Sequence, residues 1–418
     1  MDLEKIINVE YSSIQGSYWM IYGVICSFAS AFLLSKGYSN SEIGIILAAA
    51  NVLSVVMQPL VADFADRTKK FSLIGLSQLV TILLMALTVG LFVFERKTLA
   101  LSLIFVLLIA WHTTLQPLIN SLSFKLNESG INVSFGIARS MGSLFYAILM
   151  AFLGTLVENL GIRAIPVSAE IVMTMLLVSF VMTKHHFEKA KQVNGAAALK
   201  PAAGGETEVI TAETGTSEEI NLVEFIRRNK LFFLLNIGVL GVYFSNAVLN
   251  FYTMQIVVDV GGNSEDLGRV MSVMAFLEIP PMLFFGFLRK KFTCERMLKF
   301  ASIMFTIKIG VIFMAKSVMT IYAIQLIQMF SFALFLPAMV NFIHETMSRG
   351  EAVKGQALYT MMTTVSSVIA SVAGGIILDA FGAKTLTFVS TVITLLGALI
   401  VIACVDKVKH NKTPEPRK

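Results

Sequence analysis

Charged residues are scarce in this sequence of 418 residues. They make up 14% of the chain, whereas hydrophobic residues make up 56% and the mean hydropathy is +0.76. A soluble domain of this length needs far more charge to cover its surface. Apolar runs of about 20 residues recur along the whole chain, and each is long enough to cross a hydrocarbon core. The composition therefore predicts an all-α polytopic membrane protein in a lipid bilayer.

Cysteine is also rare, and no cleavable leader is found. The three cysteines are far apart, so their spacing fits neither a disulfide framework nor a zinc site. The N-terminal segment MDLEKIINVEYSS is acidic and lacks a basic region before the first apolar run, so we expect the first span to be retained. The net charge of +6 does not indicate nucleic-acid binding, because the basic residues lie between the apolar runs.

The apolar runs predict twelve transmembrane helices. If the N-terminus is cytoplasmic, the inside segments carry 24 lysines and arginines and the outside segments carry six. This excess follows the positive-inside rule and predicts that both termini are cytoplasmic, in the plasma or inner membrane of the cell. The expected spans are 11–35, 42–64, 71–93, 98–122, 134–158, 164–183, 231–258, 266–288, 297–315, 318–343, 355–380 and 384–405.

Residues 187–222 interrupt the apolar pattern. They are rich in Ala, Gly, Glu and Thr, which predicts a flexible cytoplasmic linker between an N-terminal six-helix bundle, 1–186, and a C-terminal six-helix bundle, 223–418. Two similar bundles imply a binding site at their interface that opens alternately to either side. The alternative is that membrane helices resemble one another by composition alone. One match between the halves is Gly154-x-x-x-Glu158-x-x-Gly161 with Gly375-x-x-x-Asp379-x-x-Gly382.

The segment ADFADRTKK, residues 62–70, resembles the signature of the loop between spans 2 and 3 in the major facilitator superfamily. Asp66, Arg67, Lys69 and Lys70 match that signature. The resemblance implies the major facilitator fold, with twelve helices in two pseudo-symmetric six-helix bundles, and a cytoplasmic gate formed by these four residues. The alternative is charge that only sets topology, which explains the bases but not the aspartate.

The span 5 stretch from Phe135 to Arg139, FGIAR, resembles the oligosaccharide:proton symporters (lactose permease-like) and the phenylpropionate permease-like branch. Glu278 and Lys308 fall where those symporters have a carboxylate and an arginine. The resemblance implies that Arg139 grips the substrate and that transport is coupled to protons. Arg139 lies near the start of its span, so a snorkelling side chain is the alternative.

Three positions depart from the symporter pattern. The span 4 carboxylate of those proteins aligns with Asn120, and their span 10 histidine and glutamate align with Gln328 and Ser331. The galactoside site and its proton relay are therefore not reproduced, and lactose is not the expected substrate.

Polar side chains share helix faces in spans 1, 4 and 7. Amides and phenols spaced by about one turn lie on one face, and they suit a hydroxylated ligand whose ring is covered by aromatic side chains. Hydrogen bonding between helices is the alternative. The candidate substrate-binding residues are Arg139, Asn120, Gln116, His112, Trp111, Gln15, Tyr18, Tyr22, Tyr243, Asn246, Asn250 and Gln328.

Glu278 and Lys308 are expected near the middle of their spans. A buried acid and a buried base are expected to pair, and ionisable residues at this depth are functional by default. We expect Glu278 to carry the proton and Lys308 to hold it ionised in one state. A static structural pair is the alternative.

These features favour a monomeric, proton-coupled symporter that moves a small organic solute, a sugar or glycoside, by alternating access. A proton gradient would drive it without a cofactor. The alternatives are an importer of aromatic acids or nucleosides and an efflux transporter of the same fold. A membrane enzyme is not expected, because no nucleophile–base motif, metal cluster or phosphate loop is found. The short loops argue against a receptor or scaffold.

Overall fold

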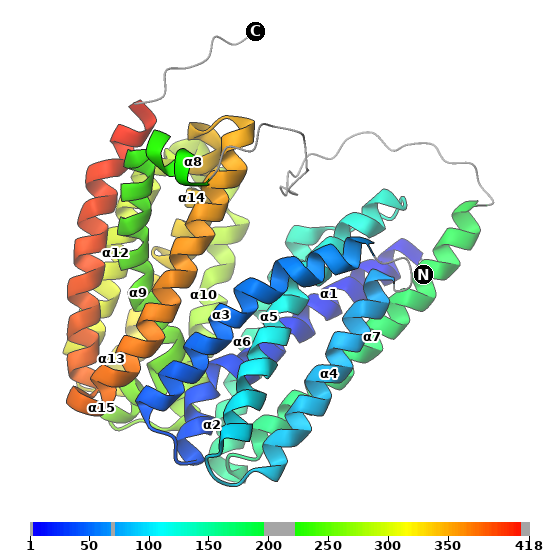
Figure 1. Cartoon of the computed structure of the whole chain (residues 1–418), viewed down its shortest axis with the longest axis horizontal. Coiled ribbons are helices and arrows are strands. Elements are labelled where there is room, and N and C mark those ends of the chain that lie inside the picture. The colour runs from blue at the N-terminus through cyan, green and yellow to red at the C-terminus, as the bar shows by residue number, and fades with distance from the viewer. Residues whose placement is uncertain (1–2, 68–71, 196–221, 411–418) are drawn as a thin grey trace. The chain divides into compact units, whose positions relative to one another are not determined.

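The computed structural model describes residues 3–67, 72–195 and 222–410, and these residues form helices and no strands (Figure 1). The elements are α1 (Leu3–Tyr22), η1 (Gly23–Ser27), α2 (Ala29–Ser35), α3 (Asn40–Arg67), α4 (Leu73–Val93), α5 (Leu99–Glu128), α6 (Phe135–Leu160), α7 (Ala164–Gly195), α8 (Leu222–Arg228), α9 (Lys230–Asp259), α10 (Ser264–Leu283), α11 (Phe285–Lys291), α12 (Cys294–Met314), α13 (Val318–Ile324), η2 (Gln325–Met329), α14 (Phe332–Thr346) and α15 (Arg349–His410).

The lengths of these helices are consistent with twelve spans. Within the described residues, nine helices are long and apolar enough to cross a membrane, and two bent helix pairs raise the number to eleven. The apolar stretch Glu351–Val408 of α15 has 58 residues, whereas about 20 residues suffice for one crossing. Gly382 interrupts α15 with a φ of 78° that glycine adopts readily, so the stretch is divided into two helices.

The chain divides into two compact units. Unit 1 comprises Met1–Glu206 and Gly262–Phe276, and unit 2 comprises Thr207–Gly261 and Leu277–Lys418. Helix α10 therefore contributes to both units. The division into two six-helix bundles and a linker stays a prediction. The structure differs from that prediction at one boundary.

That boundary is the start of the predicted linker, 187–222. Helix α7 continues to Gly195, so the linker's first nine residues are helical. Residues such as Glu188, Lys189 and Ala190 favour a helix, and nothing in their chemistry ends it where the apolar run ends. Residues 196–221 of the predicted linker lie outside the described residues.

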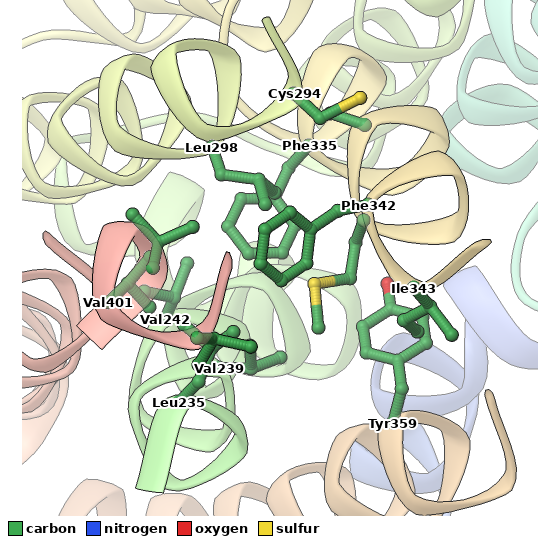
Figure 2. Packing of buried hydrophobic residues seen from close by; sticks show 14 of the residues in the cluster. Leu235, Val239, Val242, Cys294, Leu298, Phe335, Phe342, Ile343, Tyr359 and Val401 are labelled. Atoms are coloured by element: carbon green, nitrogen blue, oxygen red, sulfur yellow. The ribbon is translucent and has the colours of Figure 1, made fainter. Parts of the chain in front are cut away.

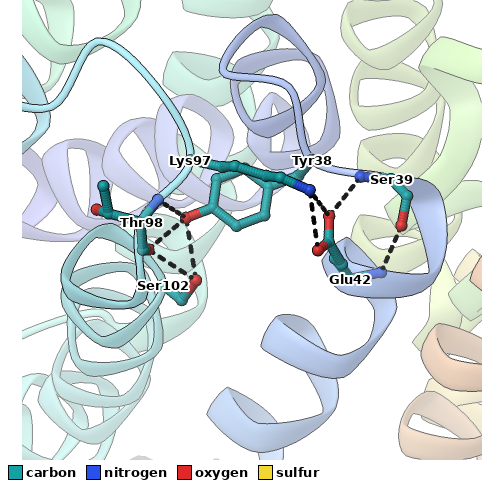
Figure 3. A network of polar contacts seen from close by, with 6 residues as sticks. All are labelled: Tyr38, Ser39, Glu42, Lys97, Thr98 and Ser102. Atoms are coloured by element: carbon teal, nitrogen blue, oxygen red, sulfur yellow. Dashed lines mark hydrogen bonds and ion pairs between the residues drawn. The ribbon is translucent and has the colours of Figure 1, made fainter.

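In unit 1, hydrogen bonds hold the start of α3 against the start of α5 (Figure 3). The Ser39 amide donates to Glu42 Oε2 over 2.9 Å and the Glu42 amide donates to Ser39 Oγ over 3.2 Å, which is a capping box. Lys97 Nζ lies 3.2 Å from Glu42 Oε1. The Tyr38 hydroxyl donates to the Thr98 carbonyl over 2.7 Å. This network connects the ends of two spans.

Helix α6 and the first part of α10 cross closely in unit 1. A Cβ atom on Gly154 would lie 2.5 Å from the Ser264 carbonyl oxygen, and one on Gly268 would lie 2.5 Å from the Met150 carbonyl oxygen. Glycine at both positions therefore allows backbone contact, as small residues do between membrane helices.

In unit 2, helix α9 packs along α15, while α12 packs against α14 and α15. Figure 2 shows the apolar core between these helices, to which each contributes large side chains. A Cβ atom on Gly397 of α15 would lie 2.6 Å from the Gly238 carbonyl oxygen of α9, so this pair also needs glycine. The labelled core residues are Leu235, Val239, Val242, Cys294, Leu298, Phe335, Phe342, Ile343, Tyr359 and Val401.

Two spans are bent and a third is interrupted by a 3-10 turn. The π-helical turn η1 precedes a 42° bend between α1 and α2, and a 56° bend follows Pro280 and Pro281 between α10 and α11. The 3-10 turn η2 interrupts the tenth span and carries Gln328. Such turns re-aim side chains and often mark functional positions in helices.

Candidate functional site

An aromatic cluster joins α1 to α5 in unit 1. The Tyr18 ring stacks on the His112 imidazole, with centroids 4.4 Å apart and planes 8° from parallel. Tyr22 lies 6.1 Å from the same imidazole. Trp19 contacts both tyrosines, at 5.3 Å and 5.5 Å between ring centroids. Three of these four residues were predicted from the sequence, and the structure brings them together.

His112 is fully buried in this cluster. Its Nε2 lies 3.1 Å from the Tyr18 carbonyl oxygen, which can only accept, so Nε2 carries the proton. Its Nδ1 is buried and has no hydrogen-bond partner within the described part of the chain. The imidazole thus ties α5 to α1 and retains unused hydrogen-bonding capacity at Nδ1.

Arg139 lies over the Trp19 ring. Its guanidinium carbon is 3.9 Å from the ring centroid, and Nη1 donates to Ser143 Oγ over 3.3 Å. A Cβ atom on Gly142 would lie 2.5 Å from Trp19 Cδ1, so glycine makes room for the indole beside α6. This cation–π contact holds the half-buried guanidinium against α1, and such packing favours a helix-facing arginine over a snorkelling one.

Amide side chains connect α1 and α5 at a second place, two turns after His112 on α5. Gln15 is buried and donates from Nε2 to Asn120 Oδ1 over 3.3 Å and to the Tyr11 hydroxyl over 2.9 Å. The predicted face of α5 therefore contacts α1 at both ends, through His112 and Asn120. Gln116 and Trp111 are half-buried on the same helix. A binding role for these residues stays a prediction.

In unit 2, Gln328 connects Glu278 to Lys308. Its Nε2 donates to Glu278 Oε1 over 2.7 Å, and its Oε1 accepts from Lys308 Nζ over 2.5 Å. An ammonium group can only donate, so the amide oxygen must face Lys308 and the amide nitrogen must face Glu278. Lys308 and Gln328 are 2% and 1% exposed, and Glu278 is half-buried. The expected acid and base are thus joined through an amide.

Tyr243 of α9 lies beside this network among aromatic rings. Its hydroxyl is 2.5 Å from the Tyr359 hydroxyl of α15, and its ring lies 5.7 Å from that of Phe335. Asn246 and Asn250 are half-buried further along α9. The buried phenol pair ties α9 to α15, whereas the two asparagines keep part of their surface exposed.

The predicted gate is described only in part. Arg67 pairs with Asp63, one turn earlier on α3, with 2.7 Å between Nε and Oδ1, and both side chains are exposed. Asp66 lies in the last turn of α3. Lys69 and Lys70 lie outside the described residues, so the gate stays a prediction.

Sequence reasoning missed several contact residues, among them Trp19, Tyr359 and His186. Trp19 follows Gln15 by four positions and precedes Tyr22 by three, so helical spacing alone could have identified it. Tyr359 could not be found in this way, because its partner belongs to another helix. The third is His186 of α7, whose Nδ1 lies 2.6 Å from Oε1 of a buried glutamate on α1.

Several of the candidate residues form a contact group in each unit. In unit 1 they connect α1, α5 and α6, and in unit 2 they connect α10, α12 and η2. A cavity shared by the two groups remains the prediction made from the sequence.

Comparison with known proteins identifies the family. The profile of the MFS_1 like family matches residues 11–389. No curated protein matches the chain. Among solved structures, the nucleoside transporter NupG superposes with a TM-score of 0.73 at 13% identity, covering 97% of this chain and 99% of that one.

Two other solved structures have a similar fold. A bacterial homologue of the human lysosomal transporter Spinster, inward-facing and unoccupied, superposes with a TM-score of 0.67 at 13% identity over 100% of both chains. An auto-inhibited POT family peptide transporter superposes with a TM-score of 0.68 at 10% identity, covering 99% of this chain and 98% of that one. The match to the family profile, over nearly the whole chain, shows that this protein belongs to the MFS_1 like family and is a multi-pass membrane transporter, not an enzyme.

Proposed function

We propose that this transporter is a proton-coupled symporter that imports a hydroxylated organic solute, a sugar or glycoside, across the cell membrane by alternating access. The observation that carries the proposal is the connection Glu278–Gln328–Lys308, in which Gln328 and Lys308 are buried and Glu278 is half-buried. A carboxylate and an ammonium group are costly inside a membrane and are rarely placed there without a function. No cofactor enters the proposal, because the proton gradient supplies the driving force.

The coupling step follows from the two hydrogen bonds of Gln328. In the arrangement described here, the amide N–H stabilises an ionised Glu278, and the amide oxygen stabilises the Lys308 ammonium. These residues belong to α10, α12 and η2, so movement of one of these helices breaks the connection. A carboxylate that loses its donors while it stays buried takes up a proton. Proton binding and helix movement are then linked.

The substrate contacts would come from half-buried residues. The planar fork of Arg139 suits a pair of hydroxyl groups, and Trp19 beneath it suits the apolar face of a sugar ring. Asn120, Asn246 and Asn250 would add amide donors and acceptors. Arg139 would also suit a carboxylate, which keeps aromatic acids among the substrates to be tested.

A nucleoside is the second candidate, because the half-buried rings of Trp19 and Tyr22, which lie against each other on α1, favour a ligand with a planar base as well as a sugar. NupG, which is described as a nucleoside transporter, has the same fold. A thermal-shift screen of purified protein against sugars, glycosides, nucleosides and aromatic acids distinguishes these classes, because a bound ligand stabilises the folded state.

Proteoliposomes test the coupling. With an imposed inward proton gradient, wild-type protein should accumulate the solute found in the screen above its outside concentration. Glu278→Gln, which fixes a neutral side chain, should lose accumulation but retain equilibrium exchange. Glu128→Gln, an exposed glutamate in the last turn of α5, is the control and should accumulate as wild type. Accumulation by Glu278→Gln at wild-type levels would remove Glu278 from the mechanism, and accumulation with no proton gradient would point to another driving ion.

A further inference from the structure

A basic pocket lies in unit 2 where α11 ends and α12 begins. Its volume is about 220 Å³, and it is lined by consecutive residues from Arg289 to Cys294 together with Glu345 of α14. Pockets for whole organic solutes measure ~300 Å³ or more. This pocket is therefore suited to a smaller chemical group, and none of its residues belongs to the proposed transport site.

The pocket carries an excess of positive charge. Arg289 pairs with Glu345, with 2.9 Å between Nη2 and Oε1, so these two charges offset each other. Cys294 Sγ also contacts that carboxylate, at 3.5 Å. Lys290 and Lys291 remain, and both side chains are exposed. Two exposed ammonium groups at a small pocket favour an anion.

The same segment exposes phenylalanines. The 56° bend after α10 turns α11 away from the axis of that helix, and Phe284, Phe287 and Phe292 are 63%, 57% and 48% exposed. The Lys291 ammonium lies 4.7 Å from the centre of the Phe287 ring. Exposed aromatic side chains beside basic ones are typical of helices at the membrane surface. The occupant of the pocket should therefore carry apolar chains as well as negative charge.

We propose that this pocket binds the phosphate headgroup of an anionic phospholipid. Lys290 and Lys291 contact the phosphate, and Phe287 and Phe292 pack against the acyl chains. The excess of basic residues predicts that this end of the spans faces the cytoplasm, where the leaflet carries anionic lipid and attracts lysines next to the membrane. The bound lipid would hold α11 at its bend, independently of which solute is transported.

Lipid titration of the purified full chain tests this proposal. The protein is placed in phosphatidylcholine nanodiscs, and phosphatidylglycerol is added while retained lipids are counted by native mass spectrometry. Wild-type protein should retain phosphatidylglycerol preferentially. The double variant Lys290→Gln, Lys291→Gln should bind it more weakly by roughly fivefold for each lysine removed, whereas Lys290→Arg, Lys291→Arg should bind it as wild type does.

The matched control is Lys184→Gln, Lys189→Gln, which removes two exposed lysines from α7 in unit 1. It should keep wild-type binding, and equal thermal stability of all variants in pure phosphatidylcholine shows that each one folds. The proposal would be overturned if the control lost as much phosphatidylglycerol binding as the Lys290→Gln, Lys291→Gln variant, or if that variant bound phosphatidylglycerol as wild type does. Competition by millimolar inorganic phosphate as strong as that by phosphatidylglycerol would assign a soluble-phosphate site and would also overturn it.

Discussion

Gln328 donates a hydrogen bond to Glu278 over 2.7 Å while its own oxygen accepts one from Lys308. One amide on a 3-10 turn thereby connects an acid on α10 to a base on α12. Glutamine is the side chain this position needs, because it offers an acceptor to the ammonium group and a donor to the carboxylate at the same time. Because Glu278 is acidic, Lys308 is basic and Gln328 is neutral, each of the three residues can be tested by a substitution of its own.

Gln328→Leu should destabilise the protein, because it leaves the buried Lys308 ammonium without its acceptor. We expect a loss of about 1–3 kcal/mol or more, as for buried polar groups left unpaired, measured as a lower unfolding temperature in detergent. Gln328→Leu combined with Lys308→Leu should recover much of this stability, since the buried ammonium group is removed together with its acceptor and only the half-buried Glu278 loses a donor. The single variant at wild-type stability would mean that Lys308 has another acceptor.

Arg139→Lys keeps the charge but loses the planar fork. We expect the KM for solute exchange in proteoliposomes to rise about tenfold, which corresponds to about 1.4 kcal/mol. The unfolding temperature should change little, because a lysine still places a cation near Trp19, and the whole contact contributes about 0.5–2 kcal/mol. Arg163→Lys, at an exposed pair with Glu95, is the control and should transport normally. Normal transport by Arg139→Lys would instead identify a snorkelling residue.

Gly397→Ala should destabilise unit 2. The new Cβ atom would lie 2.6 Å from the Gly238 carbonyl oxygen, and because that neighbour is backbone, two helices must move apart. Overpacking of this kind costs about 1–3 kcal/mol, which thermal unfolding of the purified protein measures. Gly310→Ala is the matched control, since its Cβ would make an ordinary contact of 3.6 Å with Thr391. Equal unfolding temperatures for the two variants would contradict the close crossing of α9 and α15.

Cysteine labelling tests the predicted orientation. The three native cysteines are buried, so an introduced exposed cysteine should dominate the reaction with a membrane-impermeant maleimide. Lys189→Cys, on the extension of α7, should react only in permeabilised cells. Arg96→Cys, in the loop between α4 and α5, should react in intact cells. Reaction of Lys189→Cys in intact cells, with Arg96→Cys reacting only after permeabilisation, would show that the predicted orientation is wrong.

Much of the fold could be predicted from the sequence. The twelve spans depend on local properties, namely runs of about 20 apolar residues separated by polar loops. The excess of basic residues on alternate loops predicts an orientation for the same local reason, and the match of residues 62–70 to a family loop pointed to the major facilitator fold. The family match confirms that fold. The prediction from the sequence ended the last helix of the first bundle before residue 187, whereas α7 continues to Gly195. The end of an apolar run marks the membrane boundary and need not be the end of a helix.

The contacts of the candidate site depended on the tertiary structure. The sequence marked Arg139, Glu278 and Lys308 as residues that need partners, because charge is costly in a membrane. It did not show that Trp19 lies under Arg139 or that Gln328 lies between Glu278 and Lys308. Those partners belong to different helices, so their meeting depends on how far each helix is rotated and where each span bends. The rotation and bending of a helix result from its packing against neighbouring helices. The residue pattern along that helix alone therefore does not determine them.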